Sequence, residues 1–351
     1  MAGLVETYLQ DIRVAFPNNL DRDEWRFTRY GLLTATKEQT VHPMSIISPD
    51  LREKALESEG RALQIPVMKL GSLTVKNQRS CTIGDYENES GMVDVTWATL
   101  VTDFSMMKSQ HHKNEVSYLQ DFNKKMLLVQ NLFANYIENA IYTKLDTDKS
   151  AIYNSTLVGA GGKYPLVANT LQVEPHEQDT FFNDVDVIMN QDNFWSPEWL
   201  VLGSTPLMSP VRHYLNQGAS NDERLDYQFG PYSFRFSNQV VDGSAKKATG
   251  FIMPYGSIGL LTRVNIDAKM NNKASDGTSW ETAFLDTLGF EVGVMHKSKC
   301  TDKSDVTGLE HLEATMVENF QFSIDFALLT PYNSDAVTKA GSIKKFEFLM
   351  A

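Results

Sequence analysis

The stretch Gly161-Gly162-Lys163 has residue types that could bind a phosphate, because glycines let the backbone approach the oxygens and a lysine supplies positive charge. A phosphate-binding loop also needs a glycine at position 157 and a Ser or Thr at position 164, where this chain has Leu157 and Tyr164. Gly256-Ser257-Ile258-Gly259 is one residue short of the elbow that presents a nucleophilic serine, so we expect a turn there. Neither motif predicts a catalytic site.

The histidines and acidic residues do not suggest a metal or acid–base site either. His111 and His112 are adjacent, and neighbours on a regular element rarely share one metal ion, so we expect an exposed hinge before a long helix. Glu310, His311 and Glu313 lie in a polar segment of alternating charge, which is typical of a solvated surface. The sequence therefore predicts no catalytic residue, no metal, no cofactor and a protein that is not an enzyme.

Composition and charge exclude several classes of protein. Of 351 residues, 42% are hydrophobic and 22% charged, which is globular composition, and the length predicts roughly two or three subdomains. The net charge of −12 disfavours a protein that grips nucleic acid through its phosphates, but not one that encloses it. Cys81 and Cys300 are too few for a disulfide framework. No apolar stretch is long enough to cross a bilayer, and Met1–Gln10 does not resemble a signal peptide, so we expect a soluble protein.

The first part of the chain, residues 1–61, is predicted to be an arm with two short helices. The first is amphipathic, with apolar residues at helical spacing: Leu4 or Val5, Tyr8, Leu9 and Ile12. A mixed stretch follows as far as Pro43. The second helix is expected to start at Ser48, with Pro49 in the first helical position, and to end by Gly60.

A β-rich segment is predicted over residues 62–106. Apolar residues alternate from Leu63 to Leu70 and continue at 73–75 after a turn at Gly71, which predicts a β-hairpin. The alternation returns at Val93–Trp97 and changes phase near Ala98–Leu100, where we expect a bulge or a bend. The segment has little apolar surface of its own, so we expect it to lie on another surface.

The strongest helical pattern in the chain runs from Asn114 to Leu145, a length of ~48 Å at about 1.5 Å per residue. Its apolar residues step by three and four: Leu119, Phe122, Met126, Val129, Phe133, Ile137 and Ala140. Leu127, Leu128 and Leu132 widen this face and predict a helix covered on more than one side. Glu138 belongs to the opposing polar line.

The remaining residues predict a mixed α/β region and two long strands. Residues 151–178 are expected to be loop-like. The elements expected next are a helix at 181–189, a strand at 199–202, a helix at 211–216, a strand at 232–236 and strands near 251 and 260. Long strands are expected at 288–294 and 319–328. Thr278 and Glu281 match a capping box and predict a helical turn before the first of them.

This order of parts resembles the major capsid protein of tailed bacteriophages, the Hong Kong 97 (HK97) fold. The similar phrases are Leu63-Gln64-Ile65-Pro66-Val67, Val93-Asp94-Val95-Thr96-Trp97, Tyr118 through Tyr142, Trp199-Leu200-Val201-Leu202-Gly203-Ser204-Thr205 and Thr249-Gly250-Phe251-Ile252-Met253-Pro254. The resemblance covers nearly the whole chain and implies an α+β fold. Its implied parts are an N-terminal arm over 1–61, an extended β-hairpin loop over 62–106, a spine helix of the peripheral domain over 107–150, an axial domain over 151–260, and peripheral strands with the C-terminus over 261–351.

The resemblance implies a structural protein that assembles through pentamers and hexamers into an icosahedral head enclosing double-stranded phage DNA. The implied location is the virion, with assembly in the cytoplasm of the host bacterium. The implied partners are other copies of the chain, a separate scaffolding protein, a portal and decoration proteins, with no membrane and no specific DNA contact. Some family members cross-link through a lysine of the extended loop. Lys69 and Lys76 lie in that loop, where lysines are commonly only solvated.

Four other interpretations stay open. The same fold could form the shell of a bacterial cargo compartment, as in encapsulins. Another virion component, such as a tail or head-decoration protein, would not need a helix of ~48 Å. An enzyme would need a site assembled from residues far apart in the sequence. A monomeric binding module should fold its hairpin at 62–106 back onto its own chain.

Overall fold

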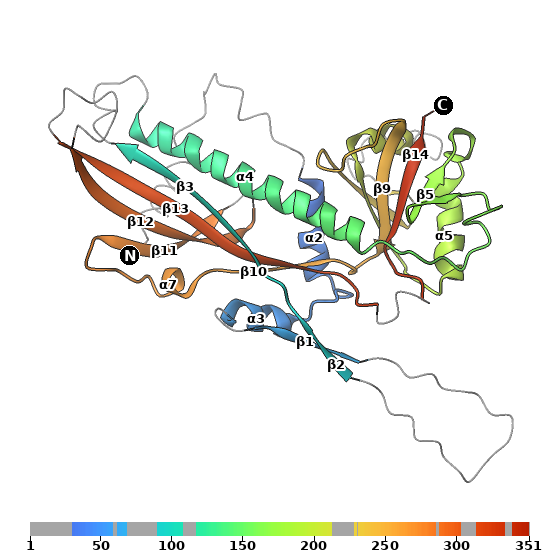
Figure 1. Ribbon diagram of the computed structural model, residues 1–351, viewed down its shortest axis with the longest axis horizontal. Helices are drawn as coiled ribbons and strands as arrows, with labels where there is room; N and C mark the ends of the chain where they lie inside the picture. Colours follow the sequence, from blue (N-terminus) through green and yellow to red (C-terminus); the bar gives the residue numbers. More distant parts are fainter. Residues whose placement is uncertain are drawn as a thin grey trace, which may run out of the picture.

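The computed structural model describes residues 30–58, 62–68, 90–107, 117–212, 228–229, 231–285, 288–302, 314–333 and 339–350. Within these ranges the chain forms a five-stranded sheet, a seven-stranded sheet, a separate two-stranded sheet and one long helix (Figure 1). The predicted α+β class is confirmed. The predicted helix at 4–12 and the turn at Gly71 lie outside the described residues.

The five-stranded sheet is antiparallel and is built around its longest strand, β13. The strands are β10 (Gly259–Arg263), β13 (Ala314–Leu329), β12 (Phe290–Asp302) and β11 (Thr278–Leu285) in that order, with β3 (Ala98–Met107) also paired to β13. Alternate residues of β13 from Phe320 to Phe326 are buried, as period-two patterning requires. Both long strands are confirmed. Strand β12 begins after the predicted 288 and continues past 294, and β13 extends beyond both of its predicted ends.

The helical turn predicted from Thr278 and Glu281 is wrong. These residues lie in β11, where Thr278 pairs with Lys297 and Glu281 with Val294 of β12. Pairing along the whole of β11 and burial of Ala283 outweigh a capping signal that involves only one turn. The helix of this region, α7 (Ile266–Lys269), begins upstream.

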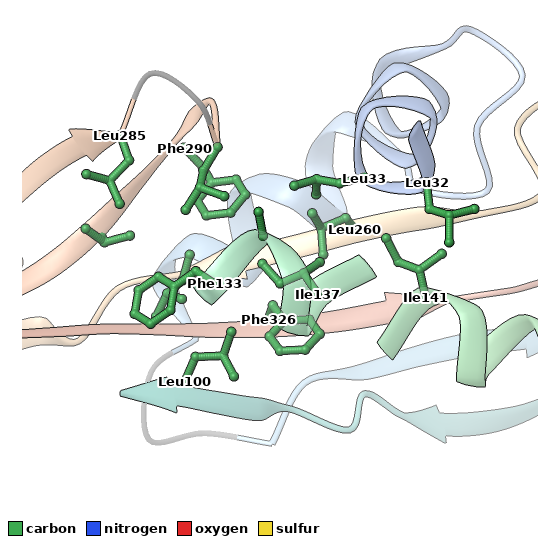
Figure 2. Close-up of a cluster of buried hydrophobic side chains, with 14 of the residues drawn as sticks. Leu32, Leu33, Leu100, Phe133, Ile137, Ile141, Leu260, Leu285, Phe290 and Phe326 are labelled. Atoms are coloured by element: carbon green, nitrogen blue, oxygen red, sulfur yellow. The ribbon is translucent and has the colours of Figure 1, made fainter. Parts of the chain in front are cut away.

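Helix α4 (Tyr118–Thr147) lies along one face of the five-stranded sheet (Figure 1). It begins later than the predicted Asn114, because Ser117 and Gln120 form a capping box that fixes its first turn. Figure 2 shows side chains of α4 packing between the sheet and helix α2 (Gly31–Val41). Helix α2 was not predicted from the sequence. The labelled residues of this core are Leu32, Leu33, Leu100, Phe133, Ile137, Ile141, Leu260, Leu285, Phe290 and Phe326.

The expectation that α4 is covered on more than one side holds only in part. The sheet covers one side and α2 packs on another, but Leu128 and Leu132 are 58% and 49% exposed. The second predicted helix of the arm is confirmed as α3 (Pro49–Glu57). Its N-cap Ser48 accepts a hydrogen bond from the Leu51 N–H at 3.2 Å.

The seven-stranded sheet lies at the other end of the molecule, with helix α5 (Phe181–Gln191) packed against it (Figure 1). Its strands in order are β4 (Leu166–Val167), β5 (Thr170–Val173), β14 (Lys344–Leu349), β9 (Lys246–Pro254), β6 (Trp199–Ser204), β8 (Tyr232–Ser237) and β7 (Gln228–Phe229). Its core is rich in aromatic rings, among them Phe181, Phe182, Phe346 and Phe348. The predicted strands at 199–202 and 232–236 and the helix at 181–189 are confirmed. Of the helix expected at 211–216, residues 211–212 are helical and the rest lie outside the described ranges.

Residues 151–178 are not simply a loop, since they contain β4, β5 and a short 3-10 helix at Pro175–Glu177. Strand β5 is buried because it pairs in parallel with β14, a partner far away in the sequence that local patterning cannot reveal. The predicted boundary between 260 and 261 does not follow the sheets. Strand β10 belongs to the five-stranded sheet, and the C-terminal strand β14 lies between β5 and β9.

Candidate assembly surface

Strands β1 (Gln64–Met68) and β2 (Ser90–Asp94) form a two-stranded antiparallel sheet of their own. Figure 1 shows this hairpin leaving the body beside α3 and pointing away from both large sheets. Gln64 pairs with Asp94, and the Gln64 Nε2 donates to the Asp94 Oδ1 at 2.7 Å. The predicted continuation of the hairpin at 73–75 lies outside the described residues. Pairing of β1 with β2 brings both ends of the hairpin onto the same anchor.

The base of the hairpin is anchored by a small apolar cluster. Val95 is 7% exposed, and its N–H donates to the Leu63 carbonyl at 2.9 Å. The cluster joins the hairpin base to α3, β10 and β13 through Ile47, Ala55, Val95, Leu261 and Ala327, with Leu51, Leu63, Ile65, Trp97 and Leu329 packed around them. The direction in which the hairpin leaves the body is therefore set by packing.

Polar contacts reinforce this anchor. The Arg263 guanidinium lies over the Trp97 ring at 4.1 Å, and its Nε donates to the Asp325 Oδ2 at 2.9 Å. Asp325 also accepts a hydrogen bond from the Thr99 hydroxyl at 2.6 Å. Ser58 accepts from Arg263 through its carbonyl at 3.0 Å, so one guanidinium connects the hairpin base, the end of α3 and the five-stranded sheet.

The strand is interrupted where the hairpin joins the sheet. Strand β2 ends at Asp94, and β3 begins at Ala98 with β13 as its partner in place of β1. The bulge predicted near 98–100 is wrong, because Ala98–Leu100 pair with β13 in unbroken register; what interrupts the strand is the link at 95–97. The whole of β3 belongs to the five-stranded sheet, so the part of 62–106 that leaves the body ends near 95–97.

Beyond its base the hairpin exposes apolar side chains on both faces. Pro66 and the 60% exposed Met92 pair on one face, while Ile65 and Val93 pair on the other and are half-buried. An isolated two-stranded hairpin is marginally stable in water at best. Pro66 cannot donate a backbone hydrogen bond, which suits an edge strand that is held by side-chain contacts. The hairpin has the chemistry of an element that packs on a surface outside its own fold.

Glu138 of α4 lies at the junction of the two large sheets, and its predicted place on an exposed polar line is wrong. Its carboxyl group is fully buried and accepts hydrogen bonds from the Leu33 N–H, at 2.6 Å, and from the Ser237 hydroxyl of β8. Burial raises the pKa of Glu138 to about 7, against the opposite effect of these hydrogen bonds. Because the Leu33 N–H belongs to the first turn of α2, Glu138 caps that helix from another element.

A buried ion pair holds the C-terminal strand in the seven-stranded sheet, and local sequence gave no sign of it. The Lys344 ammonium of β14 contacts the Asp192 carboxylate at the end of α5, with both side chains almost fully buried. Asp192 also accepts from the Asn154 N–H at 2.5 Å, and the Lys344 Nζ lies 4.2 Å from the centre of the Tyr153 ring. Burial lowers the pKa of Lys344, against the effect of Asp192.

Lys163, the lysine of the Gly161-Gly162-Lys163 stretch, forms ion pairs with two carboxylates. The Lys163 Nζ lies 2.6 Å from a Glu177 carboxylate oxygen and 2.7 Å from one of Asp184. These two carboxylates neutralise the charge that a phosphate would need.

The other motif, residues 256–259, begins in a turn, as predicted. Gly256 has φ +81°, which favours glycine.

Within the described ranges, no helix is long and apolar enough to cross a membrane, and no group of three or more His, Cys, Asp or Glu could hold a metal ion. Cys300 is exposed on β12. Eight candidate residues from the sequence lie outside the described ranges: Lys69, Lys76, Cys81, His111, His112, Glu310, His311 and Glu313.

Comparison with known proteins gives matches only among solved structures. No family model and no curated protein matches the sequence. The chain is similar to a structure from Microbacterium phage Oxtober96, with 10% identity, 97% of this chain and 98% of that chain covered, and a TM-score of 0.49. A structure from Mycobacterium phage Adephagia is also similar, with 10% identity, 97% of this chain and 98% of that chain covered, and a TM-score of 0.48. The structure described as the capsid of cyanophage P-SCSP1u has 10% identity, 97% of this chain and 94% of that chain covered, and a TM-score of 0.47.

Proposed function

We propose that this chain is the major capsid protein of a tailed bacteriophage, with the HK97 fold. In this proposal it is structural and not an enzyme, and it assembles through pentamers and hexamers into the icosahedral head that encloses double-stranded DNA. The observation that carries the proposal is the hairpin β1–β2, anchored at its base by Arg263 and Trp97 and apolar on both exposed faces.

A projecting hairpin of this kind makes a head-to-tail contact between copies. The hairpin of one copy covers a surface of the next, which offers its own hairpin to a third, so the contact is heterologous. Such contacts close into rings when the rotation between copies is a fraction of a full turn. Rings of five and six copies are the units of the shell that the resemblance implies.

The large sheets fit the remaining parts of this proposal. We assign α4 and the five-stranded sheet to the peripheral domain, and the seven-stranded sheet with α5 to the axial domain around the five- and six-fold axes. The hairpin with its base, residues 62–97, is the extended loop. A 30-residue helix packed along a sheet makes a stiff wall, and the net charge of −12 disfavours adhesion of that wall to DNA.

The proposed location is the virion, after assembly in the host bacterial cytoplasm. The proposed partners are other copies of the chain, a separate scaffolding protein, a portal and decoration proteins. The enclosed DNA needs no sequence-specific contact with the wall.

The hairpin provides the direct test. The double substitution Pro66→Lys and Met92→Asp places opposite charges on two paired positions of the exposed face and should leave the fold unchanged, because neither side chain is buried. We expect sedimentation velocity to show assembly by the wild type and by the control Met92→Leu, but not by the double variant. Unchanged circular dichroism would show that all three proteins are folded. Assembly of the charged variant at the wild-type level would contradict the proposal.

A further inference from the structure

Helix α4 exposes an apolar ridge to solvent next to the five-stranded sheet, where the Tyr136 ring also meets Phe326 of β13 edge-on. Leu128, Leu132 and Tyr136 are 58%, 49% and 57% exposed and follow one another at intervals of four residues. Residues at this spacing lie on one face of a helix, so the ridge is continuous over ~12 Å. A run of three large apolar side chains on one helix is a surface for packing, whereas single exposed leucines are ordinary.

The described chain begins beside this ridge. The Tyr30 hydroxyl donates to the Asn131 Oδ1 at 2.6 Å, and Asn131 lies within one helical turn of both Leu128 and Leu132. The contact fixes the point from which residues 1–29 leave the body. Any segment in those residues is therefore tethered close to the ridge.

The sequence of the tethered residues matches the ridge in pattern and in length. Its apolar residues at helical spacing are Leu4, Val5, Tyr8, Leu9 and Ile12. As a helix, residues 4–12 would extend ~12 Å, the same as the ridge. Residues 13–29 can span up to about 55 Å when extended, so the tether reaches the whole ridge.

We propose that residues 4–12 pack as a short amphipathic helix along the Leu128–Leu132–Tyr136 ridge of the same chain. Side chains spaced by four on α4 present a ridge that can fit between those of a second helix. The tether gives an effective concentration in the millimolar range, which favours the segment of the same chain over that of a second copy. This contact does not depend on shell assembly, so it stands or falls separately from the proposed function.

Hydrogen exchange of the full-length protein, read by mass spectrometry, tests the proposal. The ridge variant carries Leu128→Gln and Leu132→Gln, and the matched control carries Asn139→Gln and Thr143→Gln, which are exposed positions of the same helix. Glutamine is a good helix former, so α4 should persist in both. We expect residues 4–12 to be protected in the wild type and the control, and protection to fall by roughly tenfold or more in the ridge variant.

Three results would overturn the proposal. If residues 4–12 exchange without protection in the wild type, they do not pack on the protein. If they are protected equally in the wild type and in the ridge variant, they pack somewhere other than on the ridge. Protection that appears only as the protein concentration rises would assign the ridge to a second copy.

A cross-link checks the same contact by another route. With Cys81→Ser and Cys300→Ser as background, Leu9→Cys combined with Leu132→Cys should form a disulfide within one chain. Leu9→Cys combined with Val187→Cys on α5 is the control and should not. Cross-links formed only between chains, or equally by both pairs, would contradict the proposal.

Discussion

The hairpin β1–β2 and the central strand β13 share one sequence pattern and have opposite surroundings. In both, apolar residues recur at every second position. From Phe320 to Phe326 of β13 these residues are at most 2% exposed, because α4 covers them, whereas Ile65, Val67 and Val93 of the hairpin are only half-buried. Alternation thus predicts a strand and says nothing about whether its own chain covers it. The proposed role of the hairpin in assembly depends on this incomplete burial.

The largest expected effect comes from a charge on the covered side. Phe133 of α4 is 3% exposed and packs against the sheet, so Phe133→Asp should abolish soluble folding, since a buried unpaired charge costs several kcal/mol. The neighbouring Leu132→Asp, on the exposed side, should keep the fold. Soluble expression and thermal unfolding compare the two. Equal stability of both variants would mean that the helix face is wrongly assigned.

A somewhat smaller effect is expected at the buried ion pair. Lys344→Met leaves Asp192 buried without its cation, which should cost ~3–5 kcal/mol in the free energy of unfolding measured in urea. The double variant Lys344→Met with Asp192→Asn should recover part of that loss, because the uncompensated charge is gone. If Lys344→Met is as stable as the wild type, the ion pair does not hold β14 in the sheet.

A pH-dependent effect of ~3 kcal/mol is expected at Glu138. Its pKa is about 7 in the fold against 4.5 in the unfolded chain, so the folded state binds the proton more tightly. Stability therefore falls as the pH rises from 4.5 through 7, by roughly 1.4 kcal/mol for each unit of pKa difference. Glu138→Gln should remove this slope and be more stable than the wild type above pH 7, with the advantage lost below 4.5. If the free energy of unfolding depends on pH in the same way in the wild type and in Glu138→Gln, the pKa of Glu138 is not raised in the folded state.

Patterning along the chain predicted most elements that form from local sequence. The spine of α4, the strands around 199, 232 and 319, and the N-cap at Ser48 all depend on periodicity or capping within a few residues. Strand β5 was missed because it is buried by β14, and helix α2 because Glu138 supplies its cap from α4. Such features depend on contacts between distant residues, so local patterns do not contain them.

The sequence predicted that the hairpin exists, but not the contacts that hold its base. The alternation at 63–67 and 93–97 predicted a hairpin with too little apolar surface of its own. The polar contacts at its base could not be predicted, because Trp97, Arg263 and Asp325 meet only when the link between β2 and β3 packs against β10 and β13. For the same reason the sequence placed β3 in the loop, although its partner β13 lies more than two hundred residues away.

Negative-stain electron microscopy of the purified protein, over a range of protein and salt concentrations, shows whether copies of the chain assemble. We expect five- or six-membered rings, sheets, tubes or closed shells, and their loss in the Pro66→Lys, Met92→Asp variant. A protein that stays strictly monomeric under every condition, and also beside its candidate scaffolding protein, would rule out a capsid protein.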